Sequence, residues 1–158
     1  MNEKSGADND CALFFIMTKG YAGSYGAAGK CIEEDRCPDG FREDVWNRLR
    51  KWSEGRLKEY DKAMKSGSIH EALWDIGKDG YGFKVNIRDI PLEQEAVEIS
   101  EALGLNIYDL PSAGFEASVF GSDIPEGYTI IGHAKKGRDK LLINGDEISY
   151  LNRPPSQP

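Results

Sequence analysis

The clearest pattern of apolar and polar positions lies between Gly80 and Gly104. Residues 83–88 alternate between apolar and polar, which predicts a half-buried strand. Pro91 then turns the chain, since proline fixes φ and suits the first turn of a helix. From 92 to 103 apolar residues recur every three or four positions, which predicts an amphipathic helix. Gly104 predicts its end, because glycine accepts the left-handed conformation there.

The same patterns predict the other elements of the chain. An apolar run predicts a buried strand at 11–18, and residues 42–64 have helical spacing, in which Gly55 indicates a kink or two shorter helices. Asn144-Gly145 is the usual signal of a two-residue hairpin. The remaining expectations are a helix after Ser68 to about 77, a helical turn at 106–110, and strands at 115–120, 128–134, 141–143 and 147–151.

This mixture predicts an α+β fold with a mixed β-sheet flanked by helices. A chain of 158 residues favours one domain, which we place at 11–153. Residues 1–10 have no large apolar residue after Met1 and predict a disordered leader, whereas the proline-rich residues 154–158 predict a loose tail.

Charge and cysteine content narrow the classes of partner. The net charge of −7 disfavours nucleic acid and anionic membranes, which reward basic patches. No segment resembles a signal peptide or a membrane span. The three cysteines, Cys11, Cys31 and Cys37, cannot all pair in disulfides, which favours reduced thiols and a cytoplasmic protein.

Four glycines at three-residue intervals follow the first predicted strand: Gly20, Gly23, Gly26 and Gly29. Glycines let backbone N–H groups approach a phosphate, and the N-terminus of a following helix adds a favourable dipole. Neither a Walker A loop nor GxGxxG is present, however. We therefore favour a small-residue face that lets a helix pack closely on a sheet, and the flanking Lys19 and Lys30 keep phosphate binding as an alternative.

Other signatures of chemistry are weak. Cys31 and Cys37 lack a usual zinc spacing, and His70 and His133 have no partner motif, so we expect no metal site. No nucleophile motif identifies a catalytic residue. The aromatic residues of the 42–64 segment are expected in the core.

The chain resembles the C-terminal domain of the aminoimidazole ribonucleotide (AIR) synthetase superfamily. The matching motifs are Glu71-Ala72-Leu73-Trp74-Asp75, Ile90-Pro91-Leu92-Glu93-Gln94-Glu95, Leu105-Asn106-Ile107-Tyr108-Asp109-Leu110, Ser112-Ala113-Gly114 and Ile130-Ile131-Gly132-His133-Ala134. They are most similar to the hydrogenase maturation branch, whose enzyme dehydrates a thiocarboxamide. The resemblance covers about residues 12–154 and implies partial ferredoxin-like topology.

The chain departs from the family pattern where phosphates would bind. The family's phosphate loop is reduced to residues 61–68, Glu93 replaces a usual arginine, and Ser100 a usual cysteine. A helix that the family inserts between two strands has shrunk to residues 121–127, which predicts an uncovered patch of sheet. The N-terminal domain that carries the metal-binding aspartates and most of the ATP site in family enzymes has no match here.

The departures predict a stand-alone, non-catalytic relative that acts as a binding or assembly module. The expected partner is a second copy, through the uncovered sheet, or a separate N-terminal-domain protein. The alternative is half of a split ATP-dependent synthetase completed in trans, and only this alternative calls for ATP and magnesium. A remnant that senses a nucleotide or metabolite is a third possibility. The expected ligand-binding residues are Lys19, Gly20, Gly23, Gly26, Ser66, Gly67, Ser68, Ser112 and Gly114.

Overall fold

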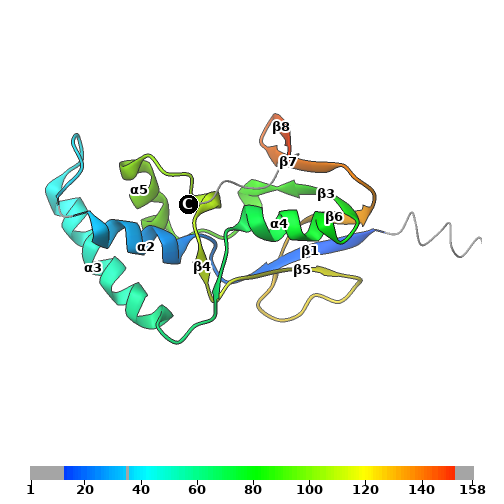
Figure 1. Cartoon of the computed structure of the whole chain (residues 1–158), viewed down its shortest axis with the longest axis horizontal. Helices are drawn as coiled ribbons and strands as arrows, with labels where there is room; N and C mark the ends of the chain where they lie inside the picture. Colours follow the sequence, from blue (N-terminus) through cyan, green and yellow to red (C-terminus); the bar gives the residue numbers. More distant parts are fainter. Residues whose placement is uncertain (1–12, 35, 152–158) are drawn as a thin grey trace, which may run out of the picture. The chain divides into compact units, whose positions relative to one another are not determined.

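A computed structural model describes residues 13–34 and 36–151 (Figure 1). The predicted leader at 1–10 and tail at 154–158 lie outside the described residues. Within them the chain forms two compact units. The first holds 13–19, 71–90 and 116–151, and the second holds 20–34, 36–70 and 91–115. No helix among these residues is long and apolar enough to cross a membrane.

The first unit is built on a six-stranded sheet in the order β5-β1-β6-β3-β7-β8. Only β3 and β7 pair in parallel, and the other neighbours are antiparallel. The predicted α+β fold with a mixed sheet is therefore confirmed. The strands are β1 (Phe14–Lys19), β3 (Tyr81–Asn86), β5 (Glu116–Phe120), β6 (Thr129–Lys136), β7 (Lys140–Asn144) and β8 (Glu147–Tyr150).

Helix α4 (Ile69–Lys78), most of which belongs to this unit, runs along one face of the sheet (Figure 1). Phe83 and Val85 are buried, whereas Lys84 between them is exposed, as alternation along a strand predicts. The Lys140 ammonium lies 5.8 Å from the centre of the Trp74 ring on α4. Since Lys140 is the register partner of Phe83, α4 covers the face that bears Phe83.

The opposite face of the sheet bears Lys84 and its register partner His133, both exposed. Residues 121–127 connect β5 and β6 by bends and a turn rather than by a helix. No helix of the first unit, as far as it is described, covers this face. Ile148 and Tyr150 on β8 are 64% and 61% exposed.

The predicted hairpin at Asn144-Gly145 is shifted by one residue. Asn144 pairs with Glu147, so Gly145 and Asp146 occupy the two turn positions. Gly145 has φ 65°, and a left-handed conformation in the turn is what a glycine accommodates.

The second unit packs three helices around an apolar core. They are α2 (Ser24–Glu33), α3 (Glu43–Tyr60) and α5 (Gln94–Leu103). Trp46 and Leu49 of α3 pack with Ile99 of α5 in this core. Gly55 does not divide α3 into two helices, because one continuous helix spans it.

Helix α5 begins later than its apolar stripe predicts. Gln94 is its first residue and Glu93 its N-cap, so Leu92 precedes the helix although it still packs against the core. Gly104 ends the helix with φ 67°, as predicted. There are also two short 3-10 helices in the described chain, Ile87–Asp89 in the first unit and Ile107–Asp109 in the second, of which the latter contacts α5.

Candidate functional site

Three segments of the second unit meet beside the N-terminus of α2. They are the glycine-rich residues 20–26, which lead into and begin α2, and the two strands β2 (Lys65–Ser66) and β4 (Ser112–Ala113). The two strands pair with each other, so that Ser66 lies opposite Ser112. We call this place the glycine–serine junction, and it contains Gly20, Gly23, Gly26, Ser66, Ser112 and Gly114.

The structure thus brings together most of the predicted ligand-binding residues. Gly67 and Ser68 follow β2 directly in the chain, and Ser68 is buried. Lys19 belongs instead to the first unit, where its ammonium lies 5.8 Å from the centre of the Tyr128 ring.

The glycines of the junction are places where two backbones come into contact. Gly20 and Gly23 have φ 86° and 75°, a conformation that favours glycine. A β-carbon on Gly20 would overlap the Gly114 carbonyl, and one on Gly23 would lie 2.5 Å from the Ile107 carbonyl oxygen. The space that each missing side chain leaves is therefore occupied by the chain itself.

The N-terminal turn of α2 also directs backbone donors toward the same segment. The Gly23 N–H donates to Ser112 Oγ at 2.9 Å, and the Gly26 N–H donates to the Pro111 carbonyl at 2.9 Å. A phosphate at a helix N-terminus binds through such N–H groups. Two of the donors that a phosphate would need are thus engaged by Pro111 and Ser112.

Residues 61–68, which stand where the family has its phosphate loop, stabilise the end of α3. The Lys65 ammonium donates to the carbonyl oxygens of Tyr60, Asp61 and Ala63. A cation at a helix C-terminus satisfies carbonyl groups that have no partner within the helix. The Gly114 N–H donates to the Met64 carbonyl, which fixes this loop against the junction.

A polar cluster that sequence reasoning missed centres on the carboxylate of Glu93. Its Oε1 accepts from Ser24 Oγ at 2.7 Å, from Arg56 at 2.8 Å and from the Tyr60 hydroxyl at 3.3 Å. The side chains of Arg56 and Glu93 are only 18% and 16% exposed. The replacement of the family's arginine by Glu93 was visible in the sequence, but the arginine that pairs with it comes from α3, 37 positions earlier.

The cluster shifts the pKa values of its members. Burial raises the pKa of the Tyr60 hydroxyl, and the adjacent Glu93 raises it further. Burial alone would lower the pKa of Arg56, but Tyr60 and Glu93 outweigh it and raise this pKa above its ordinary value. The neighbouring Glu93 thus favours the charged form of the Arg56 guanidinium.

Ser24 beside Glu93 has the geometry of a hydroxyl next to a base, which is one element of nucleophilic catalysis. Ser24 is fully buried, however, and the carboxylate is already shared with Arg56. A buried hydroxyl offers no approach to a substrate, so this arrangement acts as a structural hydrogen bond.

The histidines and cysteines do not form a metal centre within the described residues. His70 Nδ1 lies 2.6 Å from Asp109 Oδ1, and no group of three ligating side chains accompanies the pair in those parts of the chain. Cys31 is buried, and Cys37 donates to the Phe41 carbonyl at 3.2 Å. Cys11 lies outside the described residues.

No protein-family model matches the sequence, and no curated protein matches it. Solved structures do match. The crystal structure of E. coli HypE, a hydrogenase maturation protein, gives a TM-score of 0.64 at 14% identity, over 92% of this chain and 51% of that one. A HypE–HypF complex gives 0.58 at 16% identity, over 89% and 53%. Thiamine monophosphate kinase from Aquifex aeolicus gives 0.52 at 15% identity, over 92% and 52%.

These likenesses confirm, at the level of fold, the expected resemblance to the C-terminal domain of AIR synthetase-related proteins. Identities of 14–16% show a shared fold and no more. The chain spans about half the length of the proteins it matches.

Proposed function

We propose that this chain is a non-catalytic AIR synthetase C-terminal-like domain that acts as a binding or assembly module. The observation that carries the proposal is the closure of the glycine–serine junction. Ser112 and Pro111 accept from the N–H groups of Gly23, the N-cap of α2, and of Gly26, and backbone fills the space beside Gly20 and Gly23. A glycine turn built for phosphate would keep those donors for its ligand.

The polar residues around the junction support the same proposal. Lys65 holds the end of α3, and Arg56 is paired with Glu93. Both cations therefore already have partners in the chain. A phosphate that recruited either of them would have to break these contacts.

Isothermal titration calorimetry with ATP and magnesium tests the proposal. Because the Gly23 and Gly26 donors are engaged, we expect no binding tighter than about millimolar, which corresponds to roughly −4 kcal/mol. Micromolar binding accompanied by amide shifts at residues 20–26 would contradict the proposal.

The alternative is half of a split ATP-dependent enzyme, completed in trans by an N-terminal ATP-binding domain. The likeness to thiamine monophosphate kinase, a kinase by name, favours testing it. Under this alternative ATP and magnesium would bind only after a protein with the missing domain is added. A neighbouring reading frame whose product has the missing N-terminal domain, with its aspartate-rich strands, would identify such a protein.

For assembly we propose a homodimer through the exposed edge strand β8, beside the sheet face that no described helix of the first unit covers. Ile148 and Tyr150 are the largest exposed apolar groups on that strand, and exposed strand edges pair readily with other chains. One matching structure is itself a complex of two proteins, HypE and HypF, which favours a protein partner in general. Light scattering should give about twice the monomer mass, as a two-fold dimer requires, and a monomer at every concentration would remove this part of the proposal.

A further inference from the structure

We propose that a small organic anion with an apolar body binds to the sheet of the first unit, in a pocket between β3, β6 and the loop before β7. The site deepens the proposed function, because it names the class of ligand that a binding module of this fold would take. It is separate in sequence from every residue of the glycine–serine junction.

The pocket has a volume of about 380 Å³ and lies around the cross-strand pair Lys84 and His133. A second hollow of about 190 Å³ adjoins the same two residues on the side of Asn86 and Ile143. Register partners in an antiparallel sheet project from the same face, so both hollows open on the face opposite α4. The larger one has the size of an ordinary small-molecule site.

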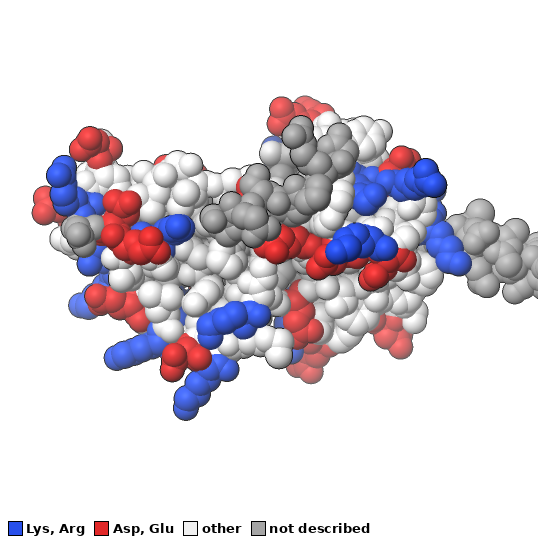
Figure 2. Space-filling view, viewed as in Figure 1, with Lys and Arg blue, Asp and Glu red and all other residues white. Residues whose placement is uncertain are grey.

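The charge of the pocket is opposite to that of the chain. Lys84, Lys135 and Arg138 line it against a single acidic residue, Asp139, whereas the whole protein carries −7. None of the ion pairs found among residues 13–34 and 36–151 includes any of these three cations. Figure 2, which shows the side of the first unit that α4 covers, has Lys and Arg side chains gathered near the turn between β6 and β7. Uncompensated cations beside low-dielectric walls attract an anion.

Part of the lining of the pocket is apolar. Leu13, which is 62% exposed, and Leu141, the register partner of Lys84, supply apolar side chains to it. The loop before β7 packs tightly on β3, because a β-carbon on Gly82 would lie 2.8 Å from the Asp139 carbonyl oxygen. The Phe83 N–H donates to that same oxygen at 2.6 Å. The loop is thus held against β3 and forms one side of the pocket, while Leu13 and Leu141 supply its apolar surface.

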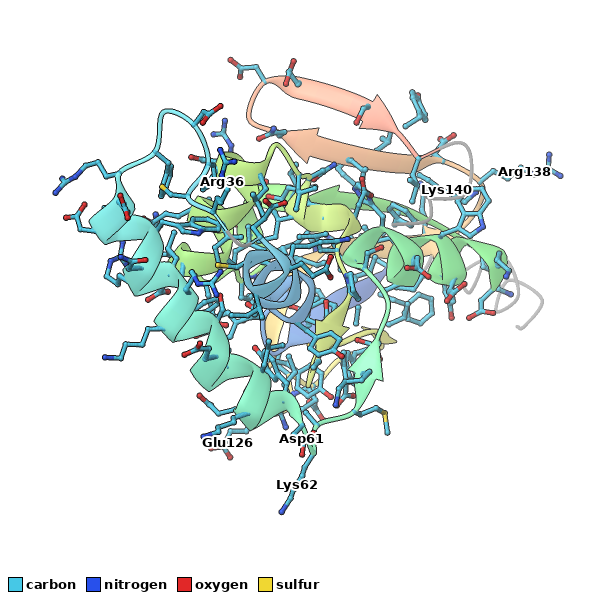
Figure 3. All side chains as sticks on the ribbon, turned by 60° about the vertical axis from the view of Figure 1, so that its left-hand side comes forward. Arg36, Asp61, Lys62, Glu126, Arg138 and Lys140 are labelled. Atoms are coloured by element: carbon cyan, nitrogen blue, oxygen red, sulfur yellow. The ribbon has the colours of Figure 1, made fainter. Side chains whose placement is uncertain are left out.

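The cations are arranged around this apolar surface at different depths. Lys84 projects from the middle of β3, whereas Figure 3 shows Arg138 extended away from the sheet, at the rim. A ligand whose ring contacts Leu141 and whose negative charge points toward Lys84 would use both the apolar surface and the cations. An inorganic anion would leave the apolar part uncovered, and a neutral ring would leave the cations unpaired.

The test compares two fluorescent probes of similar shape. Anilinonaphthalene sulfonate (ANS) carries a negative charge, and phenylnaphthylamine has similar rings without it. We expect ANS to bind with one site per chain and to shift the amide signals of residues 82–84 and 133–139. Phenylnaphthylamine should bind at least about fivefold more weakly, which corresponds to roughly 1 kcal/mol for one exposed charge pair.

Variants assign the site to its residues. Lys84→Gln and Lys135→Gln should each weaken ANS about two- to fivefold, as expected for exposed charge pairs, and leave phenylnaphthylamine unchanged. Lys51→Gln is the matched control, since Lys51 is an exposed lysine of α3 in the other unit. Equal weakening of ANS binding by all three variants would mean that ANS responds to the net charge of the protein and not to this pocket. Unchanged ANS binding in Lys84→Gln would overturn the proposed site.

The two proposals fail in different ways. Amide shifts at residues 20–26 on adding ATP and magnesium would overturn the non-catalytic function and leave the anion site intact. If ANS binds no more tightly than phenylnaphthylamine, or shifts no signal near Lys84, the anion site is wrong and the proposed function stands.

Discussion

Two glycines on the same helix should respond in opposite ways to the same substitution. Gly26 faces the segment before β4, where a β-carbon would lie 2.7 Å from Pro111 Cδ and 2.9 Å from Leu110 Cβ. Gly29, one turn later in α2, has no atom within 4 Å of that position. The pair therefore separates the effect of close packing from the effect of helix propensity.

The expected changes in the free energy of unfolding follow from these distances. In Gly29→Ala the new methyl enters open space, so the helix gains about 0.5–1 kcal/mol from reduced backbone entropy. In Gly26→Ala the same gain is outweighed, because overpacking costs about 1–3 kcal/mol. Neither Pro111 nor the Leu110 β-carbon is the flexible end of a long side chain, so we expect a net loss of about 1–2 kcal/mol.

Urea unfolding in a Trp74→Phe background provides the assay, since Trp46 and Trp52 of the second unit then supply all tryptophan fluorescence. With a slope of about 2 kcal/mol per molar urea, the midpoints of the two alanine variants should differ by about 1 M. Equal midpoints, or a more stable Gly26→Ala protein, would refute the inference that this glycine exists for contact with Pro111.

Three further predictions concern the second unit. Glu93→Gln should lower the free energy of unfolding by about 1–2 kcal/mol because it uncouples a half-buried ion pair, whereas Asp44→Asn, in an exposed pair, should change it by less than about 0.5 kcal/mol; equal effects in urea unfolding would contradict the burial argument. The raised pKa of Tyr60 means that its contribution to stability is complete below pH 10.0, the ordinary tyrosine value, and is lost as pH rises further. The free energy of unfolding should therefore fall more steeply above about pH 10 in the wild type than in Tyr60→Phe. Parallel curves for the two proteins would mean that Tyr60 does not contribute to this pH dependence. The pKa values of the Cys31 and Cys37 thiols are both raised, but only Cys31 is fully buried, so iodoacetamide followed by mass spectrometry should label Cys37 before Cys31; comparable rates would mean that Cys31 is accessible.

Local patterns in the sequence were sufficient for the long elements. Strand β3 and the end of α5 at Gly104 follow from periodicity and from the conformational freedom of glycine. The boundary at the start of α5 was wrong by two or three residues, because Pro91 suits a helix start but equally suits the extended residues before one. The pair Asn144-Gly145 correctly predicted a hairpin, but such a pair does not determine which two residues occupy the turn.

The polar cluster and the strand pair of the junction could not be predicted in this way. Strands β2 and β4 have two residues each, and a period cannot be recognised in so short a segment. Ser24, Arg56 and Glu93 lie on three elements and show no common spacing. The glycine spacing was visible, but only the structure shows that Ile107, Pro111 and Gly114 fill the space beside it.

The stretch from Gly80 to Gly104 shows why a clear local pattern did not reveal the division into units. Its strand belongs to the first unit and its helix to the second, and the chain passes between them at Ile90 and Pro91. It passes again after Lys19, where β1 ends, and before Glu116, where β5 begins. Each unit is therefore assembled from segments that are distant in the sequence. A hydrophobic period states that a residue is buried but not which unit buries it, and that information lies in contacts such as the one between Gly26 and Pro111.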